Sequence, residues 1–416
     1  MAGLAASIYL ARGGRTVTLF EKRRYLGGRA VTHLRHGYRF NLGPHAFYRG
    51  GEGSKVLAEL GVPVRGGLVK QGGIALYGKE RFKLPTGIWS LWTTGLLNLG
   101  DKREATRQLL RIRRLKKPGQ FAAMSARQWL DANVTRQRVR ETLEALLRLA
   151  TYCNSMECIN AGAALNQLRL AMRGVIYVDE GWQKIVDALH SSAVAAGVNF
   201  VTSSRVIRVD HDSAVRAIEI GGLEPETQSE TQSYLRPMPG EARGTRLASD
   251  VVLLAVDPAT ARELIGDVSW PSMIPVVLST LDVALSRLPQ PKKTFALGID
   301  RPLYFSVHSR WAQLTPKGGA LIHVARYGGG DEAELEGLLD EMQPEWRDAV
   351  VHCRFLPSMT VSNALMPPAP AVRPSATTPI RGLYLAGDWV GDVGLLSDAA
   401  LASARDAAKA MLANHT

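Results

Sequence analysis

Residues 3–22, GLAASIYLARGGRTVTLFEK, decide the fold of this chain. Residues 4–12 are small and apolar at a helical spacing, and Gly13-Gly14 follows them as it would follow a helix C-terminus. Residues 16–20 then alternate between threonine and apolar side chains, as in a short β-strand, and Glu21 ends the run. A helix followed by a strand that ends in an acid is the second half of a βαβ nucleotide-binding unit.

Glu21 is the first candidate for a binding role. An acid at the tip of the second strand of such a unit lies where an adenosine ribose presents its hydroxyls, and a carboxylate there repels a 2′-phosphate. A solvated glutamate at a strand end is the alternative. The turn Gly27-Gly28-Arg29 favours the nucleotide, because two glycines let the backbone approach a pyrophosphate and the arginine supplies positive charge.

Two stretches resemble a known family. Glu21, Lys22 and the spacer that follows, the turn Gly27-Gly28-Arg29, and Thr32 are similar to the second FAD-contacting motif of the flavin amine oxidase superfamily, which includes protoporphyrinogen oxidases and phytoene desaturases. Residues 382–391, GLYLAGDWVG, with residues 396–405, LSDAALASAR, resemble the closing FAD motif of that superfamily. The resemblance implies an α/β protein with a Rossmann-like, discontinuous FAD-binding domain and a substrate domain of mixed sheet and helices.

The resemblance also implies which residues bind the cofactor. They are Gly3, Glu21, Lys22, Gly27, Gly28, Arg29, Gly43, Pro44, Val206, Gly387 and Asp388. In this scheme Gly43-Pro44 turns beside the flavin ring, Val206 offers backbone contacts at the adenine end, and Asp388 lies near the ribityl chain or the pyrophosphate. Asp388 could equally cap the helix expected from about residue 396. No catalytic side chain is assigned.

His45 is the candidate for lining the flavin, since it follows the Gly43-Pro44 turn. The alternative is a loop histidine that is bonded only to backbone.

The start of the chain departs from the family pattern. In the superfamily a β-strand and a Gly-x-Gly-x-x-Gly turn precede the first helix, whereas here Gly3 matches only the third glycine. A Rossmann sheet is ordered around that strand, and its glycine turn receives the pyrophosphate. We therefore expect the functional protein to carry a β-branched strand and a Gly-x-Gly turn ahead of Met1.

The domain organisation follows from the motif positions. We expect the FAD-binding domain to comprise residues 1–50, 176–265 and 375–416, and the substrate-binding domain to comprise residues 51–175 and 266–374. Residues 125–172 have helical character and would form a cap over the substrate. No internal repeat, Walker loop or Ser-His-Asp arrangement is apparent.

The substrate is predicted to be hydrophobic. Residues 84–100 carry no charge, and residues 270–325 are mainly apolar and β-branched. These segments favour hydride transfer to flavin from a carotenoid-like polyene or a porphyrinogen. An amine substrate is the alternative, and a non-catalytic remnant of the fold is a third hypothesis, motivated by the missing glycine turn.

The positive charge of the chain is concentrated. The formal net charge is +13, and residues 101–120 hold eight basic residues against Asp101 and Glu104. Together with Trp89 and Trp92, this block resembles an anchor to an anionic membrane surface. The alternative is a buried cavity wall beside a solvated basic helix. Nucleic acid is not expected, because no recognised binding motif accompanies the charge.

The three cysteines favour a reducing cytoplasm over a disulfide framework, and the spacing of Cys153 and Cys158 is poor for a metal. No apolar run is long enough to cross a bilayer. We therefore expect a cytoplasmic protein without a metal, peripheral to the inner face of the membrane.

Overall fold

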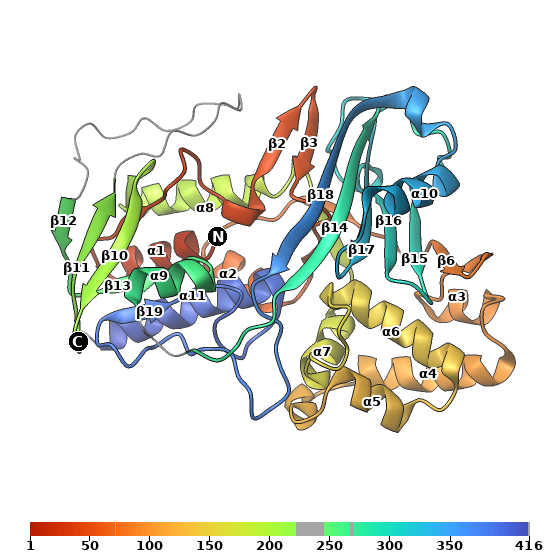
Figure 1. Ribbon diagram of the computed structural model, residues 1–416, viewed down its shortest axis with the longest axis horizontal. Coiled ribbons are helices and arrows are strands. Elements are labelled where there is room, and N and C mark those ends of the chain that lie inside the picture. Colours follow the sequence, from red (N-terminus) through yellow and green to blue (C-terminus); the bar gives the residue numbers. More distant parts are fainter. Residues whose placement is uncertain (71, 222–244, 267–269, 415–416) are drawn as a thin grey trace.

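The computed structural model describes residues 1–70, 72–221, 245–266 and 270–414. Figure 1 shows two lobes, with the long strands β14 (Val276–Leu285) and β18 (Val350–Ser362) between them. The N-terminus lies in the lobe that holds the nucleotide-binding motifs, which we call the nucleotide lobe. The other lobe, which we call the sheet lobe, contains the large sheet and most of the helices of the central part of the chain.

The nucleotide lobe is built on two pairs of parallel strands. β1 (Thr18–Phe20) pairs with β9 (Asn199–Val201), and β13 (Val252–Leu254) pairs with β19 (Leu383–Leu385). A Cβ added at Gly3 would lie 3.2 Å from the Cβ of Ala255, just past β13, and 3.9 Å from Leu19 of β1. The first turn of the first helix therefore lies between the two strand pairs.

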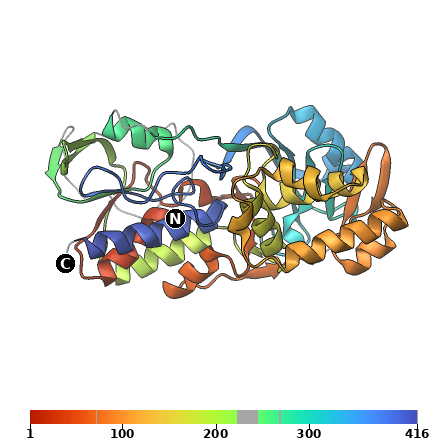
Figure 2. The same cartoon turned by 90° about the horizontal axis from the view of Figure 1, so that it is seen from below.

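Three helices pack side by side in this lobe: α1 (Ala2–Arg12), α8 (Gln183–Ala195) and α11 (Leu396–Ala413). Figure 2 shows α11 running along the other two. Ala5 of α1 and Ala404 of α11 are fully buried, and such small side chains let helix axes approach closely.

Further strands and one helix extend the nucleotide lobe. β10 (Arg205–His211), β11 (Val215–Gly221) and β12 (Thr245–Ala248) form an antiparallel sheet, and α9 (Pro258–Ile265) packs against β10.

The sheet lobe is dominated by one seven-stranded sheet, in the order β18-β14-β17-β16-β15-β6-β7. The strands not yet given are β6 (Ile74–Tyr77), β7 (Glu80–Lys83), β15 (Phe295–Gly298), β16 (Leu303–Val307) and β17 (Ala320–Tyr327). The pairing of β6 with β15 is parallel and the other pairings are antiparallel. Helix α10 (Glu332–Met342) packs against β14 and β17.

Five helices pack together in a bundle that we call the cap: α3 (Ile88–Thr93), α4 (Leu99–Arg113), α5 (Ala126–Asn133), α6 (Gln137–Thr151) and α7 (Ala161–Ala171). The helical region expected at residues 125–172 contains α5, α6 and α7. Ser125 begins α5 with the expected capping box, since its hydroxyl accepts the Gln128 N–H at 3.1 Å. The Glu104 carboxylate of α4 accepts the backbone N–H groups of Thr135 and Arg136, at 3.0 and 2.9 Å, just before α6. The cap is therefore held by these polar bonds as well as by its apolar core.

Two small sheets connect the lobes. One is the hairpin of β2 (Thr32–Arg35) and β3 (Tyr38–Asn41), and the other joins β4 (Phe47–Tyr48), β8 (Val175–Val178) and β5 (Gly66–Leu68). Short 3-10 helices cover Gly28–Ala30, Pro118–Phe121, His308–Arg310 and Trp346–Ala349.

The predicted α/β class, with a Rossmann-like lobe and a lobe of mixed sheet and helices, is confirmed. The domain boundaries stay a prediction, as does the strand expected ahead of Met1. Helix α2 (Glu52–Glu59) falls in the range given to the substrate domain, yet it packs on α11 of the nucleotide lobe. Among the described helices, none is both long and apolar enough to cross a membrane.

Candidate functional site

Glu21 and the glycine turn stand at the end of β1. The Glu21 N–H donates to Val201 O at 2.9 Å, and Glu21 O accepts the Ser204 N–H at 3.0 Å. Gly27 and Gly28 have φ values of 131° and 57°, which favour glycine. A Cβ added at Gly28 would meet no atom within 4 Å, so the backbone there faces open space.

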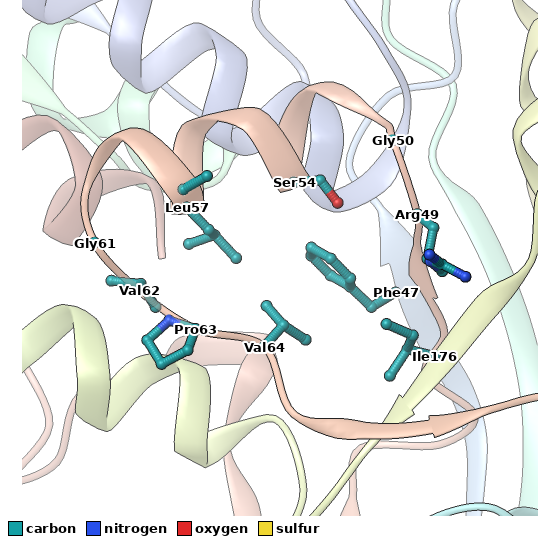
Figure 3. Close-up of a pocket in the computed structure, with 11 residues that line it drawn as sticks. Phe47, Arg49, Gly50, Ser54, Leu57, Gly61, Val62, Pro63, Val64 and Ile176 are labelled. Carbon is teal, nitrogen blue, oxygen red and sulfur yellow. The ribbon is translucent and has the colours of Figure 1, made fainter.

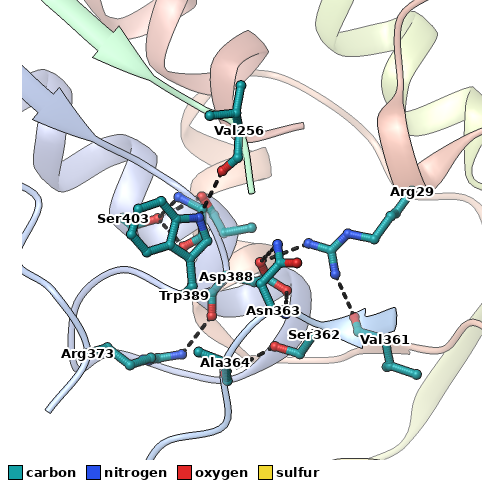
Figure 4. A network of polar contacts seen from close by, with 12 residues as sticks. Arg29, Val256, Val361, Ser362, Asn363, Ala364, Arg373, Asp388, Trp389 and Ser403 are labelled. Atoms are coloured by element: carbon teal, nitrogen blue, oxygen red, sulfur yellow. Dashed lines mark hydrogen bonds and ion pairs between the residues drawn. The ribbon is translucent and has the colours of Figure 1, made fainter. Parts of the chain in front are cut away.

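Arg29 and Asp388 form an ion pair between the two motifs (Figure 4). Arg29 Nη2 lies 2.8 Å from Asp388 Oδ1, and Arg29 Nη1 donates to Val361 O at 2.9 Å. The Asp388 carboxylate is almost fully buried and also accepts the backbone and side-chain N–H groups of Asn363, both at 3.0 Å. The pair therefore joins the N-terminal motif, the end of β18 and the C-terminal motif at one point.

The loop between β19 and α11 is fixed by polar bonds. Arg373 donates to the carbonyl oxygens of Asp388, Gly391 and Gly394 at 2.9, 2.7 and 2.9 Å. Burial lowers the pKa of Arg373 to about 10, although Asp388 and Asp392 act in the opposite direction. The N-cap of α11 is Leu395, so the capping alternative for Asp388 is wrong: seven residues of loop separate Asp388 from the helix.

Asp398, in the first turn of α11, has a hydrogen-bond partner for only one of its two carboxyl oxygens in the described part of the chain. Asp398 Oδ1 accepts the Gly53 N–H at 2.9 Å, while the buried Oδ2 has no hydrogen-bond partner in the described part of the chain. Burial raises the pKa of Asp398 to about 6. The Oδ2 atom packs against the backbone at Gly51, because a Cβ added to Gly51 would collide with it.

His45 follows a strained turn. Gly43 has a φ of 71°, and a Cβ there would lie 2.8 Å from Met359 Sδ, so glycine is required. His45 Nδ1 lies 3.1 Å from Gly43 O, and its ring is edge-on to Trp182 with centroids 5.0 Å apart. Burial lowers the pKa of His45 to about 4, with the Gly43 carbonyl opposing the shift. His45 is therefore neutral near pH 7 and contacts the backbone of its own turn, and its role beside a flavin stays a prediction.

Pro44 and the remaining predicted residues lie around this centre. Pro44 O accepts the Tyr152 hydroxyl at 3.3 Å. Val206 of β10 pairs with Ile220 of β11. It lies two residues after Ser204, whose N–H donates to Glu21 O. Gly387 N donates to Ser403 Oγ at 2.9 Å. Lys22 is exposed. The structure therefore brings Arg29 and Asp388 into contact and leaves the role of each residue toward a cofactor as a prediction.

A buried polar cluster on the large sheet was not predicted. His323 Nδ1 lies 2.6 Å from Asp282 Oδ1, and Arg354 Nη2 lies 2.5 Å from Asp282 Oδ2. Burial opposes ionisation of Asp282, but His323 and Arg354 outweigh it and hold the pKa of Asp282 at about 2. The charges of His323 and Asp282 also act on His45. The sequence holds a signal for this cluster, because Asp282 and His323 each lie inside a strand whose other residues are almost all buried.

A second row of buried groups continues this cluster. The rings of His308 and His323 lie 4.3 Å apart, and His308 Nε2 lies 3.0 Å from the Tyr304 hydroxyl. The hydroxyls of Tyr304 and Tyr177 are 3.3 Å apart. Tyr327 lies edge-on to Tyr304, at 6.4 Å between centroids. Tyr304 and Tyr327 of the large sheet therefore lie in one buried cluster with Tyr177 and His308.

Cys153, Cys158 and Cys353 are free thiols. Burial raises the pKa of Cys153 to about 11, so its thiol is not activated. The described residues contain no cluster of three or more histidine, cysteine or acidic side chains arranged for a metal ion.

Comparison with known families decides the class of protein. A model of the family described as flavin containing amine oxidoreductase matches residues 1–412. The chain belongs to this family. It is therefore a flavin-dependent oxidoreductase.

Solved structures share the fold. An oxidoreductase from Methanosarcina mazei has a TM-score of 0.72 at 17% identity and is matched over 98% of each chain. A protein assigned as a protoporphyrinogen oxidase from Exiguobacterium sp. 255-15 has a TM-score of 0.71 at 15% identity, over 100% of this chain and 97% of that one. An engineered putrescine oxidase has a TM-score of 0.70 at 12% identity, over 99% and 97%.

The residues at the meeting point of the motifs fit a flavin nucleotide. Open space at Gly28, the Arg29 guanidinium and the N–H groups in the first turn of α11 supply the room and the donors that a charged, hydroxyl-rich group requires.

Proposed function

We propose that this flavin-dependent oxidoreductase binds FAD across the two motifs. The observation that carries the proposal is the contact of Arg29 with Asp388, which unites residues that are 359 positions apart in the sequence. Glu21 at the tip of β1 would receive the ribose hydroxyls, and the Gly27-Gly28-Arg29 turn would face the pyrophosphate. Gly387, Asp388 and the start of α11 would hold the flavin half.

The cofactor would supply hydride acceptance, and the chain would supply placement and electrostatics. The N-terminal end of α11 carries partial positive charge, which favours negative charge nearby. His45, with its pKa lowered to about 4 by burial, would line the ring as a neutral group. Asp282 would fix the orientation of His323 behind it.

A hydrophobic substrate, of the polyene or porphyrinogen kind, is the substrate class that we propose. It is supported by the apolar cluster that runs without interruption from the cap to the sheet and includes Leu143, Leu165, Leu278 and Tyr327. An amine is the second candidate, supported by the edge-on Tyr152–Tyr327 pair, with ring centroids 6.3 Å apart, because aromatic faces attract ammonium groups.

We further propose that the protein works in the cytoplasm as a peripheral protein on an anionic membrane. Trp89 is 77% exposed, Trp92 is 42% exposed, and Leu99 at the start of α4 is 57% exposed. Arg103 and Arg107 of α4 are exposed and form no ion pair in the described part of the chain. Indole rings at the headgroup level and nearby basic side chains are the pattern of an interfacial anchor.

Anaerobic reduction of the purified, flavin-loaded protein tests the substrate class. We expect bleaching of the flavin absorbance by a polyene or a porphyrinogen and none by putrescine. Bleaching by putrescine alone would establish the amine alternative instead.

A further inference from the structure

An apolar groove with Phe47 in its lining lies on the nucleotide lobe. It has a volume of about 540 Å³ and runs between α2 and the small β4-β8-β5 sheet. Figure 3 shows Phe47, Leu57, Val64 and Ile176 facing a common space. Ligand pockets in proteins range from about 300 to 1,000 Å³, so this volume suits a small molecule or one hydrocarbon chain.

Two arginines stand at one end of this groove. Arg49 is part of its lining, and Figure 3 shows it beside Ile176. Its backbone N–H donates to Gly174 O at 3.2 Å, which brings the neighbouring Arg173 alongside. A Cβ added at Gly50 would lie 3.8 Å from Arg173 Nη1, and one added at Gly174 would lie 4.0 Å from Arg49 Cδ.

Neither guanidinium is neutralised within the described residues. Both side chains are exposed, and neither forms an ion pair or a side-chain hydrogen bond with another described residue. Positive charge is concentrated further by Arg169, whose pKa is lowered by burial and by the charge of Arg173. The nearby Leu68 is 46% exposed and would lie 2.8 Å from a Cβ on Gly174, so apolar surface continues past the arginines.

We propose that this groove is a binding site for a single-chain anionic amphiphile. The hydrocarbon chain would lie along Phe47, Leu57 and Ile176, and the carboxylate or phosphate head would be held between Arg49 and Arg173. Burial of each methylene of the chain favours binding, and guanidinium groups suit carboxylate and phosphate geometry. The groove is separate from the proposed flavin site. Phe47 links the two only through Trp182, because the Phe47 and Trp182 ring centroids are 6.2 Å apart and Trp182 packs on His45.

Calorimetric titration of the full chain with monomeric dodecanoate tests this site. We expect saturable binding at one molecule per chain. The double variant Arg49→Gln with Arg173→Gln should weaken dodecanoate binding by about tenfold, since two charged hydrogen-bonding partners are lost. The same variant should bind dodecanol as the wild type does. Ala58→Trp, which fills the groove from α2, should weaken the binding of both.

A matched control removes two positive charges from elsewhere in the same lobe. Arg208→Gln with Arg262→Gln should leave dodecanoate binding unchanged, because these exposed residues of β10 and α9 do not line the groove. A parallel titration with dodecyl lysophosphatidate compares the two head groups. Tighter binding of lysophosphatidate than of dodecanoate indicates a phospholipid ligand, and weaker binding indicates a free fatty acid. Lack of saturable dodecanoate binding, or equal affinity in the wild type and the Arg49/Arg173 double variant, would overturn the proposal.

Discussion

Two aspartates of the C-terminal motif, ten residues apart, have opposite surroundings. The Asp388 carboxyl group has Arg29 and Asn363 as partners, so its burial is compensated. Asp398 accepts one bond from Gly53 and leaves its other oxygen without a partner in the described chain. Asp388 therefore links two motifs with its hydrogen bonds made, whereas Asp398 lowers the stability of the folded protein.

Replacement of Asp398 by asparagine is expected to stabilise the cofactor-free protein. Burial raises the folded-state pKa of Asp398 from 3.8 to about 6, so its favourable contribution is present below pH 3.8 and is lost as the pH rises through 6. Asparagine keeps the oxygen that Gly53 needs and carries no charge, so the gain at pH 7.5 should be at most about 3 kcal/mol.

Thermal unfolding across pH measures this effect. The midpoint of Asp398→Asn should exceed that of the wild type at pH 7.5, and the two should converge below pH 4. The exposed Asp392→Asn variant is the control and should follow the wild type. A lower midpoint for Asp398→Asn at pH 7.5 would contradict the assignment of a strained, buried carboxylate.

Arg29→Lys should weaken flavin retention. A lysine has one point charge and cannot contact both Asp388 and Val361 O as the two guanidinium nitrogens do. We expect the dissociation constant for FAD to rise about tenfold, as for the loss of one charged hydrogen bond. Fluorescence titration of the apoprotein measures it, with the exposed Arg24→Lys as control. An unchanged constant for Arg29→Lys would remove Arg29 from the binding site.

At the scale of elements, the uncharged segment 84–100 has both buried and exposed apolar side chains. Leu91, Leu96 and Leu97 are buried in the cap, whereas Trp89 and Trp92 remain exposed beside α4. The sequence could not separate these sets, because α3 has only six residues and gives too short a helical period. Which side of a short helix is buried is decided by contacts with α4, which the local pattern does not contain.

Trp89→Ala with Trp92→Ala should reduce binding to anionic liposomes, because exposed indole rings insert at the headgroup level. Neutralising basic residues of α4 should cost on the order of 1 kcal/mol each and should matter less at high salt. Sedimentation with vesicles measures both effects. The control is Val194→Ala, which removes an exposed apolar side chain from α8 in the nucleotide lobe. If the tryptophan variant sediments as the wild type does, the surface of α3 is not a membrane anchor.

At the scale of the whole molecule, local motifs predicted the α/β class, the helix ends and the glycine turns. Residues 2–12 and 18–20 form the expected helix and strand because their spacing alone specifies them. The cluster of Asp282, His323 and Arg354 was missed because its members come from three strands that are adjacent only after the sheet has formed. The packing of α2 on α11 could not be read from the sequence for a similar reason, since the two helices lie over 330 residues apart.

The proposed function requires one cofactor held between the two ends of the chain. The most direct measurement is to denature the purified protein, separate the released small molecules by chromatography and quantify them against the chain. We expect FAD, approaching one molecule per chain, with less in Arg29→Lys and an unchanged amount in Arg24→Lys. Stoichiometric NAD without flavin would contradict it.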